Sequence, residues 1–419
     1  MTVLIIGASG IIGRAHLQNL TERSNLNIIA ASRRPETNLP SNVLPFPIDL
    51  MSDREIDETV LKPVTTMVYC AYADAPTWEA QRAPNNLLFK AALDLVERAC
   101  PHLKHVTLLQ GTKAYGSHLG PFKTPAKETD PRVSEGFFYY DQHDLLIERS
   151  VIRDWNWTVL RPHVVIGPAF RSPLNLMAVI GVYASLMKAM NQPLAFPGPH
   201  AAFKAIYQAT DSKLLSNAIY WGSKAREAQN EIFNVTNGDF FRWSNLWSRI
   251  ASIFDLEAVG PKPQSLVKTM SNVAPIWREL ALKHELIVED LSALVSWSFA
   301  DYVFGTTWDV MSDTQKLRRA GFLECIDSEQ IILKQMNELR HPLILSVRNT
   351  DSQRGIKRGG CERCSFALAK YFQISQYLFF GVRFGYPGCV RFFLNTKFPS
   401  FFVRSSIATH HQNELFPND

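Results

Sequence analysis

The sequence predicts an α/β protein, with a doubly wound parallel sheet and a smaller C-terminal cap. Short apolar runs alternate with segments of helical period through residues 1–168, and no hairpin turn joins two runs. The first apolar run also ends in a glycine-rich turn that leads into a helix. With 419 residues, 46% of them hydrophobic and 20% charged, the chain has the composition of a globular protein with a large core.

The first element is the unbroken apolar run Val3–Ile6, which is typical of a strand buried on both faces. Residues 7–13 follow as Gly-x-x-Gly-x-x-Gly, and a helix is expected to begin near Ile11. Glycines there permit a tight turn and let main-chain N–H groups approach a pyrophosphate, which a helix N-terminus also attracts. Between a strand and a helix, this motif indicates dinucleotide binding. The expected contacts in the turn are Gly7, Ser9, Gly10, Ile11, Ile12 and Gly13.

The second strand, expected at Leu26–Ala31, ends in Ser32, Arg33 and Arg34. An acidic residue at this position would accept hydrogen bonds from the adenosine ribose, whereas arginines pair with a 2′-phosphate. We therefore expect NADPH or NADP rather than NADH, with these three residues at its adenosine end. The alternative is that the two arginines are solvated surface charges that point away from the nucleotide.

The carboxyl ends of the later strands should complete the nucleotide site, because ligands of doubly wound sheets bind there. Strands are expected at residues 43–49, 105–110 and 157–161, a strand with its exit at 66–73, and helices at 53–59 and 85–100. Asp49 and Leu50 are expected to cover the adenine, and the small Ala71 allows close passage of the cofactor. Further contacts are expected at Gln110 and Val165.

The sixth strand stops at Arg161-Pro162, and Gly167-Pro168 closes the next loop. This arrangement resembles the extended short-chain dehydrogenases, which carry it beneath the nicotinamide. Those enzymes usually place a catalytic Tyr four residues before a Lys, and the tyrosines ahead of this strand lack that partner. Tyr220 and Lys224 have the spacing, but they follow the Arg-Pro strand, so we interpret them as a surface helix end.

Two further motifs make the resemblance specific. Gly-Thr-Lys113-x-Tyr115-Gly follows strand five, and Phe138-Tyr139-Tyr140-Asp141 opens the next helix. Together they resemble the progesterone 5β-reductase and iridoid synthase-like family, over roughly residues 1–345. The resemblance implies a Rossmann fold and NADPH-dependent 1,4-reduction of an enone, with some members acting on simple carbonyls. Ala114 and Tyr72 depart from the family pattern, so substrate identity cannot be transferred.

The resemblance also implies the catalytic residues. Lys113 would come from the strand-five loop and Tyr140 from the helix, and both would contact the cofactor. Tyr140 would donate a hydrogen bond to the carbonyl oxygen as negative charge builds there, and Lys113 would hold the nicotinamide ribose. Adjacent residues at a helix start face different directions, so only one of Tyr139 and Tyr140 can serve, and the family match favours Tyr140. The substrate pocket is expected to include Tyr72, Ala114 and Tyr115.

The leading hypothesis is therefore an NADPH-dependent enone or carbonyl reductase acting on a hydrophobic small molecule in secondary metabolism. An epimerase or dehydratase of the same superfamily is one alternative, although the sugar-nucleotide members normally carry the missing Tyr-x-x-x-Lys. A non-catalytic sensor that binds NADP is another. The retained Lys113 and Tyr140 argue against the sensor.

The chain is expected to divide into three parts. Residues 1–168 form the NADP-binding domain, and residues 169–345 form a substrate cap interleaved with the last sheet strands. Residues 346–419 hold ten Lys or Arg against four Asp or Glu, and ten phenylalanines lie between residues 366 and 402. This atypical basic tail has no sustained period, which indicates either a gene-model extension outside the native fold or an appendage that binds a partner or a membrane surface.

Composition excludes several other classes of protein. The net charge of +5 belongs to the tail, so no nucleic-acid surface is expected on the body. No leader precedes Val3 and no run of 18 uninterrupted apolar residues occurs, so we expect a cytoplasmic protein without a membrane span. The six cysteines show no disulfide framework, and Cys361-x-x-Cys364 supplies only half a zinc site, so reduced thiols and no metal are expected. The composition is compatible with a homodimer as well as with a monomer.

Overall fold

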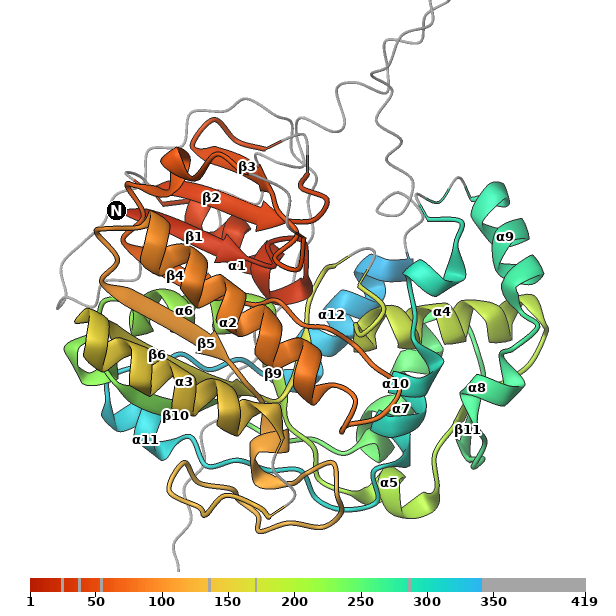
Figure 1. Ribbon diagram of the computed structural model, residues 1–419. Helices are drawn as coiled ribbons and strands as arrows, with labels where there is room; N and C mark the ends of the chain where they lie inside the picture. Colours follow the sequence, from red (N-terminus) through yellow and green to blue (C-terminus); the bar gives the residue numbers. More distant parts are fainter. Residues whose placement is uncertain are drawn as a thin grey trace, which may run out of the picture. The chain divides into compact units, whose positions relative to one another are not determined.

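The computed structural model describes residues 1–23, 26–36, 39–52, 56–134, 137–169, 172–284, 286 and 288–340 (Figure 1). Its centre is a seven-stranded sheet in the order β10-β6-β5-β4-β1-β2-β3, with every neighbouring pair parallel. The predicted doubly wound class is confirmed. The tail predicted at 346–419 lies outside the described residues. The strands are β1 (Thr2–Ile6), β2 (Asn27–Ser32), β3 (Val43–Pro47), β4 (Thr66–Tyr69), β5 (His105–Leu109), β6 (Asn156–Pro162) and β10 (Glu231–Val235).

Helices cover both faces of this sheet because its strands are apolar on both sides. α1 (Ile11–Thr21) and α6 (Ser212–Gly222) pack together on one face, and α2 (Arg82–Ala99) and α3 (Phe138–Arg153) cover the other. Strand β1 shows the division directly. Val3 and Ile5 belong to the core beneath α1 and α6, whereas Leu4 and Ile6 belong to the core beneath α2 and α3. Because side chains alternate between the two faces of a strand, this one apolar run contributes to two separate cores.

The second half of the chain adds a mainly helical cap with its own apolar core (Figure 1). Aromatic rings dominate that core, and Phe196, Trp243, Trp247 and Phe304 contact one another at centroid distances of 5.2–6.4 Å. Two short parallel sheets, β7 with β9 and β8 with β11, join the cap segments. The elements are β7 (Val164–Ile166), α4 (Leu176–Ala189), β8 (Leu194–Phe196), α5 (His200–Lys204), β9 (Ala209–Asp211), η3 (Arg226–Ala228), α7 (Trp243–Ile253), β11 (Ala258–Pro261), α8 (Leu266–Thr269), α9 (Ala274–Lys283), η4 (Leu291–Ala293), α10 (Trp297–Gly305), α11 (Gln315–Arg319) and α12 (Ser328–Arg340).

Several predicted boundaries shift in the structure. Within the segment 66–73, expected to hold the fourth strand and its exit, β4 ends at Tyr69, so Ala71 and Tyr72 lie in the exit loop. The helix expected at 53–59 is replaced by η1 (Glu58–Leu61), a short 3₁₀ turn capped by Asp57, and residues 53–55 lie outside the described part. Among the described helices, none is long and apolar enough to cross a membrane.

Candidate active site

The glycine-rich turn has the geometry that a pyrophosphate requires. Gly7 has φ +86°, a conformation that side chains rarely adopt, and a Cβ there would lie 2.8 Å from the main-chain nitrogen of Ala71. A Cβ on Gly13 would overlap the Gly7 carbonyl oxygen. Helix α1 begins at Ile11 after the N-cap residue Gly10, and no side chain of a described residue caps it, so the N–H groups of its first turn remain available. Both glycines and the uncapped helix therefore fit a dinucleotide.

The end of β2 carries the three residues that the sequence analysis places at the adenosine end of the nucleotide. Ser32 is buried as the last residue of the strand, whereas Arg33 and Arg34 are exposed and form no ion pair with any described residue. The acidic residue of this segment, Glu36, pairs instead with Arg14. Further along the same edge, Asp49 lines a hollow of about 480 Å³ between the exit of β3 and helix α2, together with Leu50.

Lys113 lies directly after β5, in the 3₁₀ turn η2 (Thr112–Tyr115). Its Nζ is 3.6 Å from the ring centroid of Trp78, 5.1 Å from that of Phe137 and 5.9 Å from that of Tyr302. Burial lowers the pKa of Lys113 to about 7, and the carboxylate of Asp74 offsets part of that shift. The ammonium makes no hydrogen bond or ion pair with a described residue, so this amine is available to another ligand.

The two candidate tyrosines at the start of α3 have different environments. The Tyr140 hydroxyl donates a hydrogen bond to the Ala114 carbonyl oxygen at 2.7 Å and accepts one from the Val133 N–H at 2.9 Å. Both capacities of a phenol are thereby used within the main chain. This geometry does not support the sequence-based choice of Tyr140 as the proton donor.

Tyr139 and Lys113 share Phe137 as a neighbour. The Tyr139 ring packs edge-on against Phe137 at 4.8 Å, and Phe137 is also one of the rings around the Lys113 ammonium. Burial raises the pKa of the Tyr139 phenol, and the positive charge of Arg161 partly opposes that rise. No hydrogen bond links the Tyr139 hydroxyl to any residue in the described part of the chain, so this hydroxyl can donate to a ligand.

Arg161, at the end of β6, supplies the positive charge under this site. Its side chain is 6% exposed, it has no ion pair with a described carboxylate, and its guanidinium lies 5.0 Å from the ring centroid of Tyr115. Gln110 connects it to Tyr139: the Gln110 amide oxygen accepts from Arg161 Nε at 3.0 Å, and its amide nitrogen donates to the Tyr139 carbonyl oxygen at 2.7 Å. Gln110, predicted as a nucleotide contact, therefore has its side chain committed to positioning these two residues.

The remaining predicted pocket residues differ in exposure. Tyr72 is 39% exposed and its ring lies 6.3 Å from that of Phe138, whereas Ala114 and Tyr115 are buried. The Tyr115 hydroxyl donates to Asn234 Oδ1 at 2.6 Å, so it braces strand β10. Val165, in β7, is half-buried.

Sequence reasoning missed Trp78 and Tyr302. Both lie in segments without a recognisable motif. The only available signal was that each is an aromatic residue near a strand exit or in the cap.

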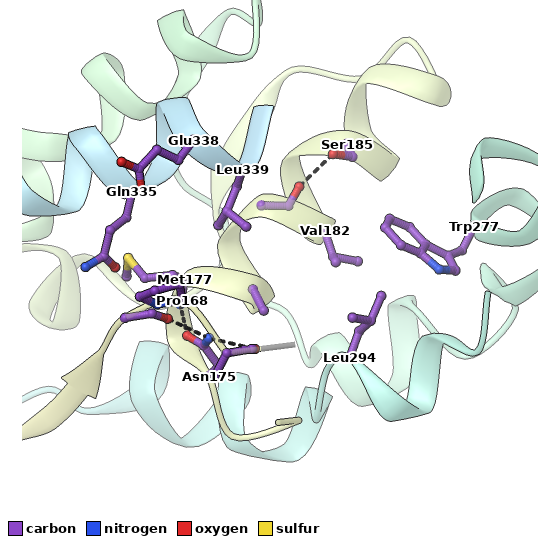
Figure 2. Close-up of a pocket in the computed structure, with 14 residues that line it drawn as sticks. Pro168, Asn175, Met177, Val182, Ser185, Trp277, Leu294, Gln335, Glu338 and Leu339 are labelled. Atoms are coloured by element: carbon purple, nitrogen blue, oxygen red, sulfur yellow. Dashed lines mark hydrogen bonds between the residues drawn. The ribbon is translucent and has the colours of Figure 1, made fainter. Parts of the chain in front are cut away.

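A separate small cavity of about 70 Å³ lies within the cap, between α4, α9, α12 and the segment after η4 (Figure 2). Its walls are mostly apolar, and the residues drawn there do not include Lys113, Tyr139 or the rings around them. The buried amide nitrogen of Gln335 donates to Asp211 at 3.2 Å, while Glu338 is the titratable group in the lining. Without a buried acid or base of its own, this cavity is a space for apolar groups rather than a reaction site.

The parallel sheet, the glycine turn and the Arg-Pro strand end define a Rossmann-fold protein of the extended short-chain dehydrogenase/reductase type. The solved structures of that type share the fold at low identity. A UDP-glucose 4-epimerase from Thermotoga maritima has a TM-score of 0.56 and 15% identity, covering 81% of this chain and 98% of its own. The terminal R domain of the myxalamid biosynthetic pathway has a TM-score of 0.56 and 17% identity, covering 82% and 91%.

Within that class, the chain belongs to the PRISE-like Rossmann-fold family, whose profile matches residues 48–315. An (S)-8-oxocitronellyl enol synthase of Antirrhinum majus is 29% identical over 358 residues, covering 80% of this chain and 91% of its own length. A 3-oxo-Delta(4,5)-steroid 5-beta-reductase of Arabidopsis thaliana is 30% identical over 346 residues, covering 76% and 87%. The resemblance inferred from the Lys113 and Tyr139-Tyr140 motifs is confirmed.

Proposed function

We propose that this protein is an NADPH-dependent oxidoreductase that reduces the conjugated C=C bond of an enone, or a simple carbonyl, on a hydrophobic small molecule of secondary metabolism. The observation that carries the proposal is that a half-buried Lys113 amine and a Tyr139 hydroxyl, neither bonded to a described residue, both lie next to Phe137 at the carboxyl end of the sheet. The names of the relatives, a steroid 5-beta-reductase among them, support the same chemistry.

The nucleotide would lie across the carboxyl edge of the sheet. The turn from Gly7 to Gly13 would bind its pyrophosphate, Arg33 and Arg34 would pair with its 2′-phosphate, and the hollow beside Asp49 would take its adenine. Val165 and Ala71 would flank its nicotinamide end. When bound, NADPH supplies the hydride that adds to the β-carbon of the enone.

The chain's own residues would stabilise the charge that develops on the substrate. Tyr139 would donate its hydroxyl proton in a hydrogen bond to the carbonyl oxygen, where negative charge builds. The buried guanidinium of Arg161 would add positive potential, and through Gln110 it fixes the main chain at Tyr139. Lys113 would hold the ribose hydroxyls. These roles replace the assignment of Tyr140, whose hydroxyl is used within the main chain.

Absorbance at 340 nm tests this function directly. Purified protein with a panel of cyclic and acyclic enones should consume NADPH, and mass spectrometry should find products two hydrogen atoms heavier. NADPH binding without consumption across the whole panel would favour the non-catalytic sensor, and an isomerised product without net reduction would favour an epimerase.

The nucleotide preference has its own test. Arg33→Ala with Arg34→Ala should weaken NADP binding by about 10- to 100-fold, because charge-assisted hydrogen bonds contribute about 1.5–3 kcal/mol. NAD binding should change little. Lys62→Ala, an exposed charge elsewhere on the same domain, is the matched control. Equal loss of both nucleotides would contradict the role given to the arginines.

A further inference from the structure

Three aromatic rings from separate segments surround the ammonium group of Lys113. We call Trp78, Phe137 and Tyr302 the aromatic cage. Trp78 lies between β4 and α2, Phe137 precedes α3, and Tyr302 comes from α10 of the cap. The rings also contact one another edge-on, with centroids 5.5 Å apart for Trp78 and Tyr302 and 6.5 Å for Trp78 and Phe137. The cage is therefore a formed site whose walls come from both halves of the described chain.

Lys113 is held in this cage by weak forces. Its Nζ lies over the Trp78 ring at 3.6 Å, in the range of a cation–π contact, and no described carboxylate or carbonyl oxygen accepts a hydrogen bond from it. Burial also lowers its pKa to about 7, which means that the cage replaces the lost hydration only in part. An anionic nucleotide with ribose hydroxyls offers this ammonium both opposite charge and hydrogen-bond acceptors, so binding should draw it out of the cage.

The vacated cage would suit one class of ligand. Its walls are aromatic faces and edges, with the His118 ring in contact with Trp78 at 5.6 Å and with Phe137 at 5.2 Å. Aromatic surfaces pack best against flat unsaturated groups. Phe137 contacts Tyr139 at 4.8 Å, so a ligand in the cage would lie next to the proposed hydrogen-bond donor. A second cation is disfavoured because the Lys113 charge stays nearby.

We propose that the aromatic cage is a binding subsite for the planar, unsaturated end of a neutral substrate, and that the Lys113 side chain fills it until the nucleotide binds. The inference rests on the proposed function, since it takes Lys113 to be the residue that moves to the nucleotide ribose. Its consequence is an order of binding in which the nucleotide comes first and the substrate second.

Calorimetric titration with 2-cyclohexen-1-one tests the proposal without turnover, because NADP carries no hydride to transfer. If the cage is free in less than a tenth of nucleotide-free molecules, the enone should bind at least about tenfold more tightly when NADP is present. Lys113→Ala should bind the enone without NADP about as tightly as the wild-type complex does. Lys90→Ala, which removes an exposed lysine paired with Asp94, is the control and should behave as wild type.

Two outcomes would overturn the proposal: equal enone affinity of the wild type with and without NADP, or unchanged enone affinity in nucleotide-free Lys113→Ala. Trp78→Leu gives a second reading, because loss of the cage wall should weaken enone binding in the presence of NADP while leaving NADP affinity within about twofold. A separate NADP titration distinguishes failure of this inference from failure of the proposed function: absence of NADP binding contradicts the function, whereas tight NADP binding without any effect on the enone contradicts only the cage.

Discussion

Exchanging the hydroxyl for hydrogen at each of the two neighbouring tyrosines separates catalysis from stability. Tyr139→Phe removes a hydroxyl that bonds to no described residue, so folding should be nearly unaffected. If that hydroxyl stabilises the developing oxyanion, kcat should fall by about 100- to 1,000-fold, as for the loss of one such donor elsewhere.

Tyr140→Phe should have the opposite effect. It leaves the buried Ala114 carbonyl and the half-buried Val133 N–H without their phenol partner. An unsatisfied buried group costs about 1–3 kcal/mol, and the Val133 N–H can reach water, so we expect a total loss of about 1–3 kcal/mol and a fall in Tm of several degrees. The activity of the folded fraction should stay within about threefold of the wild type, since small positional shifts also lower rates.

The assay is NADPH oxidation at 340 nm, paired with thermal melts of the same preparations. Tyr220→Phe is a matched control, because Tyr220 is on α6 and packs against Arg23 instead of the site. A Tyr140→Phe variant that folds normally but does not turn over, beside an active Tyr139→Phe variant, would refute the assignment and restore the choice favoured by the family resemblance.

Three further predictions follow from separate features. Gly13→Ala should weaken NADPH binding at least about tenfold in a fluorescence titration, because its Cβ would overlap the Gly7 carbonyl oxygen. Gly260→Ala is the control and should bind NADPH normally, because the space around Gly260 is open. Equal affinities of the two variants would count against the turn as the pyrophosphate site. Asn234→Ala should lower the free energy of unfolding by about 2–4 kcal/mol in urea, because its side chain bonds to Tyr115, Ala126 and Asp313 inside the protein; a loss below about 0.5 kcal/mol would contradict this. Lys113→Met should stabilise the nucleotide-free protein relative to wild type, most strongly below pH 7. The pKa of Lys113 in the folded protein, about 7, lies below its value in the unfolded chain, so the unfolded chain binds more protons between these two values. The stability of the wild type therefore rises from about pH 7 to 10. Melts of both proteins from pH 6 to 9 should therefore converge as pH rises, and a constant difference would exclude a buried charge at Lys113.

The sheet could be predicted from the sequence because its signals are local. Apolar runs such as Val3–Ile6 identify buried strands, and the glycine turn after the first run indicates both a helix start and a ligand. The strand ends were less certain, since Ala71 and Tyr72 continue the apolar run of β4 after its ladder has stopped at Tyr69. Hydrogen bonding, which hydropathy does not record, decides where a strand ends.

The site could be predicted only in part. Lys113 follows from its motif, but the directions of Tyr139 and Tyr140 depend on the angle at which α3 packs against α2 and β6, which no local pattern specifies. Trp78 and Tyr302 meet because the cap folds onto the loop after β4, a contact between residues far apart in the sequence. The same is true of Asn234, whose partners lie in three other segments.

The position of β10 has a consequence for how the protein is made. This strand closes the sheet beside β6, with Asn234 opposite Arg161, although the ribosome synthesises α4 and much of the cap between them. In a nascent chain that has emerged only through Pro162, β6 would therefore be an unpaired edge strand, and such strands pair readily with strands of other chains. For the same reason, a gene split after residue 168 should yield an insoluble first product, because the outermost strand of its sheet would be encoded on the other fragment.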